Sequence, residues 1–344
     1  MMGMDERKKN ILHAIIQDYV ATAEPVGSRT IARKYSLGVS SATIRNEMAD
    51  LEDMGFIEQP HTSSGRIPSD KGYRFYVDFL MKKINITPPE EQFIYGQLVA
   101  NIQHMEDLFK KTSDTLSQLT NYIALSVGPH VSETKVQQIQ LLPMQSNKVL
   151  LMIISDKGVV DNGIINFSAD FDQESLRVVS EILTYKLQGY KLRDISKTVL
   201  QEIYFELADY KKLVSQVLNF MDDKLKVSDK SKVHIGGMLN ILKQPEFKDV
   251  ETLRSILTLM EEQTVLRQVL EETRSGSGLT ISIGGENKYQ GIHNCSIITA
   301  TYKMDGKVIG TVGILGPTRM VYPKATTMLE FVSKCLSDIF EGYK

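Results

Sequence analysis

Ala42, Thr43, Arg45, Asn46 and Ala49 are the residues of this chain whose types and spacing best fit recognition chemistry. At ~100° per residue, Ala42, Asn46 and Ala49 share one helix face, and Thr43 and Arg45 flank it. An Asn side chain can bond adenine bidentately, an Arg can bond guanine, and an Ala or Thr methyl can touch the thymine methyl. The two alanines let a helix approach base edges closely. The pattern therefore predicts a helix that reads the major groove of duplex DNA.

A helix of defined ends must position these side chains. Ser40 has the side chain of an N-cap, and Gly55 has the backbone freedom of a C-terminal stop. Ile44, Met48 and Leu51 recur at helical spacing on the opposite side and are expected to face a core. The alternative is an ordinary surface helix in a three-helix bundle.

The charge along this helix predicts which half meets DNA. Its start carries Ser40, Ser41 and Thr43 together with free backbone N–H groups, a combination that suits phosphate. Its end carries Asp50, Glu52 and Asp53, which phosphate would repel. Only the N-terminal half is expected to enter the groove.

The flanking sequence predicts the rest of a winged helix. Helices are expected at about 6–20 and 29–35, the second capped by Ser28, with the breakers Pro25 and Gly27 between them. After Gly55, residues 56–59 are extended, 60–66 form a turn, and 67–68 return. Arg66 and His61 are expected near the tip of this wing, where an Arg can reach a minor groove or backbone. A fourth helix follows Ser69-Asp70.

Basic residues around this unit are candidate phosphate contacts: Arg29, Arg33 and Lys34 on the second helix, and Lys71 and Arg74 after the wing. For each of them the alternative is a solvated surface charge. The predicted DNA-binding residues are Ser28, Arg29, Arg33, Ser40, Ser41, Ala42, Thr43, Arg45, Asn46, Ala49, Arg66 and Lys71.

Composition bounds the class of protein. A chain of 344 residues with 42% hydrophobic content predicts two to three packed domains. The net charge is −2, and residues 1–84 hold 12 Lys/Arg against 11 Asp/Glu, so DNA binding must depend on where charges lie rather than on bulk charge. No apolar run reaches the ~18 residues that span a bilayer, and the N-terminus lacks the pattern of a secretory signal. Cys295 and Cys335 are expected to be cytoplasmic thiols.

The remainder predicts an α+β domain with an insertion. Residues 84–89 read as a hinge, and a helical stretch with a heptad-like seam (Ile102, Phe109, Leu116, Ile123) follows to about 127; it is expected to pack on its own domain, with a dimer interface as the alternative. Strands are expected at 135–142, 149–154 and 159–167, separated by turns at 145–147 and 156–158. Further strands are expected at 279–283, 295–302 and 308–315, the last two joined in a hairpin through Asp305-Gly306. All six are expected to form one sheet. The mostly helical residues 190–274 would then be an insertion.

Residue sets for catalysis, cofactors and metals are missing. The six His show no metal-ligand spacing, and no glycine-rich segment precedes Lys-Ser/Thr at a helix start. His293 and Cys295 could share one strand face as a thiol–imidazole pair, but such a pair is usually structural. Residues 284–291 could line a small-molecule pocket, with a surface loop as the alternative. We expect no enzyme, no cofactor and no metal.

Three motifs taken together indicate a family: residues 26–78, Gly236–Phe247 (GGMLNILKQPEF) and Gly313–Pro323 (GILGPTRMVYP). With them the chain resembles the HrcA family of heat-inducible transcription repressors over nearly its full length. The resemblance implies a winged helix-turn-helix domain (1–84), a linker (85–100), a GAF-like domain (101–189 and 275–344) and an inserted dimerising domain (190–274).

The resemblance also implies a function. It is negative regulation of class I heat-shock (chaperone) operons by a homodimer that binds a CIRCE-type inverted repeat in double-stranded DNA. Changes at Leu239 or Phe247 of the expected insertion should then reduce operator affinity through a lost dimer or a lost fold. A GroEL-type chaperonin would maintain the active repressor, which would lie in the bacterial cytoplasm and at the nucleoid when bound, not at a membrane. Two alternatives stay open. One is a small-molecule-sensing winged-helix regulator that uses the GAF-like domain; the other is an enzyme with a DNA-binding appendage, which the missing catalytic sets disfavour.

Overall fold

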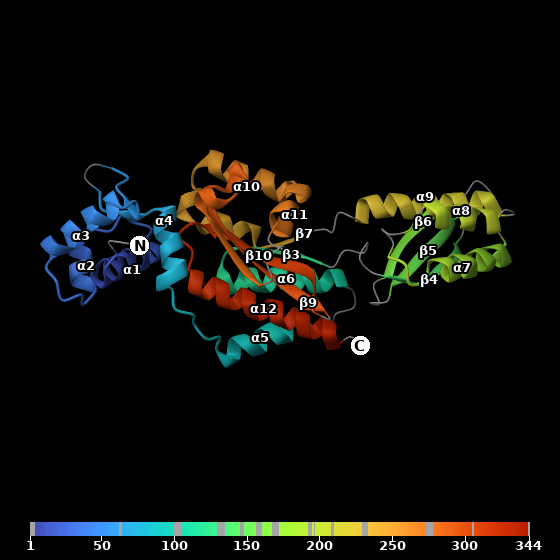
Figure 1. Cartoon of the computed structure of the whole chain (residues 1–344), viewed down its shortest axis with the longest axis horizontal. Helices are drawn as coiled ribbons and strands as arrows, with labels where there is room; N and C mark the ends of the chain where they lie inside the picture. Colours follow the sequence, from blue (N-terminus) through green and yellow to red (C-terminus); the bar gives the residue numbers. More distant parts are fainter. Residues whose placement is uncertain are drawn as a thin grey trace. The chain divides into compact units, whose positions relative to one another are not determined.

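The structure, a computed structural model, describes residues 4–61, 64–99, 105–128, 135–144, 148–155, 160–166, 172–191, 195, 197–207, 210–228, 233–272, 278–304 and 306–342. The chain divides into two compact units (Figure 1). The first unit joins Met1–Val127 to Val233–Gly342, and the second consists of Gly128–Lys232 with the last two residues.

The first unit begins with a winged helix. Its elements are α1 (Glu6–Thr22), α2 (Ser28–Lys34), α3 (Ser41–Asp53), β1 (Ile57–Glu58), β2 (Ile67–Pro68) and α4 (Asp70–Phe75), which continues as the short η1 (Tyr76–Leu80). Ile15, Ile31, Ile44 and Leu51 are fully buried between the helices. The predicted order of three helices, a wing and a fourth helix is confirmed, and so is the inward face of α3.

Local sequence signals account for the ends of these helices. The Ser40 side chain accepts a hydrogen bond from the Thr43 N–H at 3.2 Å, and the Ser69 side chain accepts one from the Gly72 N–H at 3.1 Å. Gly55, just beyond α3, has φ +76°, a conformation that favours glycine. The predicted cap of α2 differs, because Gly27 occupies the N-cap position and Ser28 is the first helical residue.

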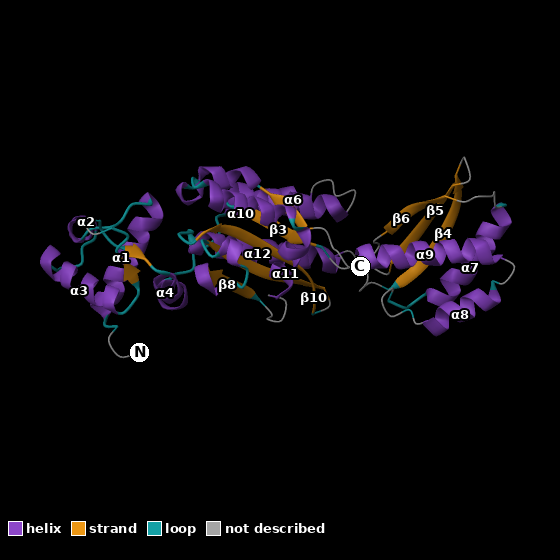
Figure 2. Cartoon of the chain, turned by 90° about the horizontal axis from the view of Figure 1, so that it is seen from above, coloured by secondary structure: helices purple, strands orange, loops and turns teal. Residues whose placement is uncertain are grey.

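A five-stranded antiparallel sheet forms the second part of this unit (Figures 1 and 2). Its strand order is β7-β3-β10-β9-β8. The strands are β3 (Ile123–Val127), β7 (Val233–Gly236), β8 (Leu279–Ile283), β9 (Cys295–Met304) and β10 (Lys307–Pro317). The predicted hairpin between the last two strands is confirmed, since Met304 pairs with Lys307 and Gly306 has φ +72°; Asp305 lies outside the described residues.

Helices cover both faces of this sheet, because its buried residues alternate between two clusters. Ile298 packs in one cluster with α5 (Pro88–Val99), α6 (Met105–Thr120) and α12 (Tyr322–Gly342). The adjacent Ile297 packs in the other with α10 (Val250–Glu261), α11 (Gln263–Glu272) and the short turns η5 (Met238–Lys243) and η6 (Pro245–Phe247). The predicted packing of the seam on its own domain is confirmed for Phe109 and Leu116, whereas Ile102 lies outside the described residues.

The second unit has its own sheet and core. Strands β4 (Val136–Met144), β5 (Lys148–Ser155) and β6 (Val160–Asn166) pair antiparallel in that order. Helices α7 (Gln173–Leu187), α8 (Lys197–Glu206) and α9 (Lys211–Ser228) cover one face. Their Leu183, Ile203 and Val217 are buried in one cluster with Ile139 and Leu151 of the sheet.

The prediction of one sheet from all six strands is therefore wrong. Strands β4, β5 and β6 form a separate sheet, and the places beside β8–β10 are taken by β3 and β7. The compact inserted unit spans 128–232 rather than 190–274, and it contains the sheet of β4–β6 beside its helices. The sequence predicts a helix up to about residue 127, whereas Ile123–Val127 form β3. Its five consecutive buried residues lack the alternation by which a strand is predicted. The predicted turns at 145–147 and 156–158 lie outside the described residues.

Candidate nucleic-acid interface

Helix α3 presents a polar face of small and hydrogen-bonding side chains to solvent. Ala42, Arg45, Asn46 and Ala49 are exposed, as the helical spacing predicts. Ser40 is also exposed, whereas Ser41 and Thr43 are half-buried at the helix start. Because the two alanines leave Arg45 and Asn46 projecting above a low surface, this face can approach base edges.

Three exposed arginines add positive charge to the winged helix. Arg29 and Arg33 of α2 and Arg45 of α3 are exposed, and over the described ranges none of them forms an ion pair or a side-chain hydrogen bond. Lys34 differs, because its Nζ lies 2.6 Å from the Asp18 carboxylate. The three guanidinium groups are the most available phosphate or base contacts of the winged helix.

Arg66 lies at the base of the wing, not near its tip as predicted. Its backbone exchanges two hydrogen bonds with Val26, at 2.8 and 2.9 Å, and its guanidinium is paired with the Glu52 carboxylate at 2.7 Å. The local turn is closed instead by Ser64, whose N–H and hydroxyl both donate to the His61 carbonyl. A phosphate contact by Arg66 remains a prediction, and it would require Glu52 to share or release this side chain.

Lys71 and Arg74 also have protein partners. The Lys71 Nζ donates to the Met54 carbonyl at 2.7 Å and lies 4.7 Å from the centre of the Phe56 ring. Arg74 points toward Glu286 of the sheet domain, which consists of the five-stranded sheet of the first unit and the helices packed on it. It is therefore not the free phosphate contact that the sequence predicts. Lys71 is exposed and stays a predicted DNA contact.

Gly65 is a structural residue of the wing that the sequence analysis missed. A Cβ at this position would lie 2.5 Å from the Val26 backbone carbon and 2.7 Å from that of Pro25. The wing therefore rests directly on the connection between α1 and α2, which explains a glycine next to Arg66. The signal that points to it is the isolated glycine just before the returning strand.

Replacing Gly65 with Ala is expected to lower the stability of the winged helix by about 1–3 kcal/mol, because overpacking against a backbone forces the wing away. Thermal unfolding followed by circular dichroism measures the change, and DNA binding should fall with it. Gly96→Ala is the control, since a Cβ there meets nothing within 4 Å. Equal melting temperatures for both variants would contradict the close approach.

Replacing Arg66 with Ala tests its predicted phosphate contact. If Arg66 neutralises a phosphate when bound, affinity for all sequences should fall together and the slope of log K against log salt should become shallower by about 0.9. Titrations at several salt concentrations measure that slope, with Arg29→Ala as the comparison. A slope equal to that of the wild type would assign Arg66 to its Glu52 pair alone.

No catalytic or metal centre was found among the residues that the structure describes. There, no three His, Cys, Asp or Glu side chains gather as metal ligands. The His293 Nε2 lies 2.9 Å from the Asn287 carbonyl oxygen, and burial raises the pKa of the Cys295 thiol to about 12, so the considered thiol–imidazole pair is disfavoured.

Two places bear on the small-molecule site that the sequence offers: one small pocket and the loop of Gly284 and Gly285. A pocket between β3, η5 and η6, lined by Tyr122, Ile241, Phe247 and Cys295 among others, has a volume of about 10 Å³, room for one water. Residues Gly284 and Gly285 pack against Asp70 of α4. In the part of the chain described, no helix is long and apolar enough to cross a membrane.

Together, the three helices, the β-wing and the exposed α3 face define a winged helix-turn-helix DNA-binding protein. A family model described as the HrcA DNA-binding domain, a winged helix-turn-helix transcription repressor, matches residues 4–77, and one described as the HrcA protein C-terminal domain matches 106–326. The chain belongs to the HrcA family. It is a DNA-binding transcription repressor and not an enzyme.

Full-length relatives agree with the family models. The chain is 44% identical over 340 residues to the heat-inducible transcription repressor HrcA of Pelotomaculum thermopropionicum, covering 99% of this chain and 98% of that protein. It is 46% identical over 341 residues to the HrcA of Moorella thermoacetica, covering 99% of both. A crystal structure of a hypothetical protein shares the fold with TM-score 0.68 and 22% identity, covering 99% of this chain and 100% of that one.

Proposed function

We propose that this chain represses chaperone operons by binding, as a homodimer, to an inverted-repeat operator of the CIRCE type. The observation that carries the proposal is the α3 face, where exposed Arg45 and Asn46 stand between exposed Ala42 and Ala49. The names of the full-length relatives, heat-inducible transcription repressors, support the class of operon. Such a repressor would act at the nucleoid in the bacterial cytoplasm.

A single winged helix makes too few base contacts for tight specific binding at physiological salt. Two copies double the contacts and predict an operator with two-fold symmetry, its half-sites separated by whole turns of ~34 Å. The dimer is therefore a requirement of the proposed function, and the chain needs a surface on which a second copy can pair.

The face of the second unit's sheet opposite α7, α8 and α9 is our candidate for that surface. The helices of this unit pack on the face that holds Ile139, Leu151 and Ile165. On the other face, Leu142 pairs with Leu150, which pairs with Ile164, so one apolar row crosses all three strands. The row's outer members, Leu142 and Ile164, are 43% and 49% exposed. An exposed apolar row of this kind is a candidate contact surface between identical subunits.

Leu239 and Phe247, which the sequence assigns to an insertion at 190–274, lie in the first unit instead. We expected changes at Leu239 or Phe247 to weaken operator binding through the dimer or the fold. Phe247 is buried in the sheet domain, and Leu239 lies on η5 of the same unit with 73% of its surface exposed. For Phe247 the expected loss now follows from the fold alone.

A GroEL-type chaperonin is the proposed input signal. A repressor that needs the chaperonin to reach or keep its folded state competes for it with heat-unfolded proteins, so active dimer falls when those clients are abundant. Large exposed apolar side chains such as Phe205, 89% exposed, are compatible with recurrent capture by a chaperonin. Repression is then released in proportion to unfolded protein.

A gel-shift titration on the chain's own upstream promoter tests the proposal, with random-sequence DNA of equal length as the control. We expect preferential binding to one inverted-repeat segment, and a larger active fraction when chaperonin and ATP are present. A folded protein that binds promoter and random DNA equally, with or without chaperonin, would overturn the proposal. An active fraction that ignores chaperonin would overturn the chaperonin step alone.

A further inference from the structure

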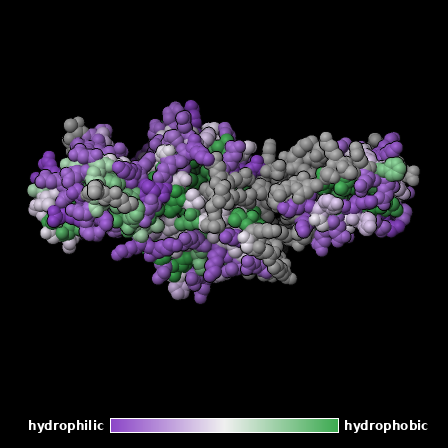
Figure 3. Space-filling view, in the orientation of Figure 1, coloured by the Kyte–Doolittle hydropathy of each residue, from purple (hydrophilic) through white to green (hydrophobic). Residues whose placement is uncertain are grey.

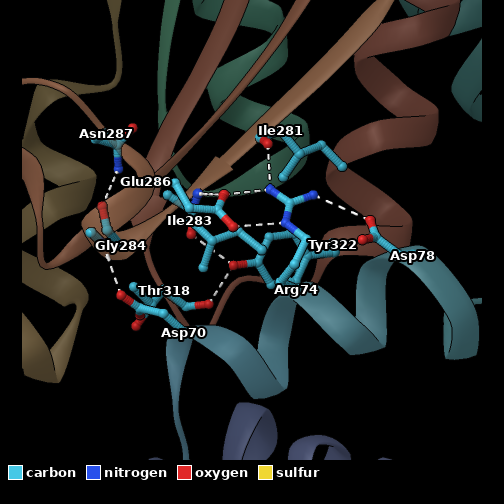
Figure 4. Close-up of polar contacts among 12 residues, drawn as sticks. Asp70, Arg74, Asp78, Ile281, Ile283, Gly284, Glu286, Asn287, Thr318 and Tyr322 are labelled. Atoms are coloured by element: carbon cyan, nitrogen blue, oxygen red, sulfur yellow. Dashed lines mark hydrogen bonds and ion pairs between the residues drawn. The ribbon is translucent and has the colours of Figure 1, made fainter. Parts of the chain in front are cut away.

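Arg74 joins the winged helix to the sheet domain through several hydrogen bonds (Figure 4). Its Nε donates to Glu286 Oε1 at 2.8 Å, and its second amino group donates to Glu286 Oε2 at 2.5 Å and to the Ile281 carbonyl at 2.6 Å. Asp78 holds the remaining amino group at 3.2 Å. This bidentate geometry fixes direction as well as distance.

The ionised state of Glu286 agrees with this pairing. Burial opposes ionisation of the carboxyl, but the hydrogen bonds from Arg74 and from the Ile283 N–H outweigh it, so the pKa of Glu286 lies below its usual value. Both oxygens of the carboxylate are used, one by Arg74 alone and one by Arg74 and Ile283. The pair is thus held on both sides by backbone groups of the sheet domain.

Asp70 makes a second contact one turn earlier on α4. Its Oδ2 accepts a hydrogen bond from the Gly285 N–H at 2.8 Å. Gly284, with φ +53°, lets this backbone approach, because a Cβ there would lie 2.1 Å from the Asp70 carboxylate. Gly284 and Gly285, which the sequence offers as part of a pocket loop, therefore contact α4 through Asp70.

Further contacts connect the winged helix to the sheet domain. The Arg319 side chain of the sheet domain donates to the Val20 carbonyl at the end of α1 at 2.9 Å and is paired with Glu246. The rings of Tyr73 and Tyr322 lie 6.0 Å apart, within one hydrophobic cluster that runs from the winged helix to the sheet. The hinge expected at 84–89 follows Asp70 and Arg74 in the sequence, so it does not separate the winged helix from the sheet domain.

We infer that Arg74 and Asp70 are positioning residues that fix the recognition helix relative to the sheet domain and so set the spacing of half-sites that the repressor accepts. The inference rests on the proposed dimer. One added base pair turns a half-site by about 34° and moves it about 3.4 Å along the duplex. Without these bonds the winged helix could follow such a shift on its own, whereas a winged helix held at Glu286 and Gly285 can follow it only together with the sheet domain.

The experiment uses full-length protein and inverted-repeat duplexes selected by the wild type from a random library. The selected half-site is rebuilt with spacers changed by one to five base pairs, and as a single half-site. For the wild type we expect an affinity loss of about tenfold for a one-base-pair change. For Arg74→Glu we expect a loss of under about threefold for the same change, with single half-site affinity unchanged.

The double variant Arg74→Glu with Glu286→Arg restores the charge pair in reverse and should restore the sharp spacing preference. Arg177→Glu is the control, because Arg177 pairs with Glu174 and Glu181 within α7 and joins no domains. Melting curves identify a misfolded single variant, for which Arg74→Gln replaces Arg74→Glu. A folded Arg74 variant with the wild-type spacing profile would overturn the positioning role alone. A wild type that selects no inverted repeat from the library would overturn the proposed function, whereas one that selects an inverted repeat but binds every spacing equally would overturn the inference.

Discussion

Replacing Arg45 with Ala is expected to weaken operator binding by about 1–3 kcal/mol and to relax the base preference at one position of each half-site. Arg45 is exposed on the first half of α3, and among the described residues no carboxylate pairs with it. Its guanidinium is free to bond a guanine edge at no cost to the fold. The loss should therefore appear in binding while the melting temperature is kept.

Competition titrations with operator variants substituted at each position measure this effect. Arg33→Ala is the matched control, because Arg33 is an equally exposed arginine on α2 that we expect to contact phosphate. Its loss should be similar for operator and random DNA. If Arg45→Ala also loses affinity equally on both, Arg45 is a backbone contact and another residue of α3 reads the base.

Placing aspartates at Leu142 and Ile164 is expected to convert the dimer to a monomer and to lower operator affinity by at least about 100-fold, since interface hot spots are worth ~2 kcal/mol or more each. Both side chains are partly exposed at opposite ends of the apolar row, so the second unit can fold with aspartates there. In a subunit interface, the same charges would be buried without partners.

Sedimentation velocity measures the oligomeric state, and gel shifts measure binding to the full operator and to one half-site. Half-site affinity should be unchanged, because α3 is untouched. Phe205→Asp is the control: Phe205 is the more exposed apolar residue of the same unit but lies on α8, away from the row. A double-aspartate variant that stays dimeric would place the interface elsewhere. Other hydrophobic patches on the largely hydrophilic surface, visible in Figure 3, would then be the next candidates.

The winged helix was predictable because its signals are local. Ser40, Gly55 and Ser69 mark the ends of elements within a few residues, and Ile44, Met48 and Leu51 mark the buried side of α3. The central sheet was not predictable in the same way. Its partners β3 and β10 are almost 200 residues apart, and a continuous apolar run such as β3 reads equally well as a buried helix.

The same contrast holds for the candidate site. The exposed face of α3 follows from helical periodicity alone, so Arg45 and Asn46 were placed correctly on it. The partners of the basic residues were not accessible to that reasoning, because Glu286 lies 212 positions from Arg74. In the sequence, a basic residue next to a wing predicts a phosphate contact. Only the folded chain shows which carboxylate already pairs with that residue.

The pairing of β3 with β7 has a consequence for how this protein can be cut and rebuilt. Val127 and Val233 are direct neighbours across the two strands, and residues 128–232 leave and rejoin the sheet at that one edge. A tight turn could bridge the gap and leave every strand of the host in register. If the second unit holds the dimer surface, as we propose, the shortened chain would bind a single half-site as a monomer, and the removed unit could be fused to other proteins to make them pair.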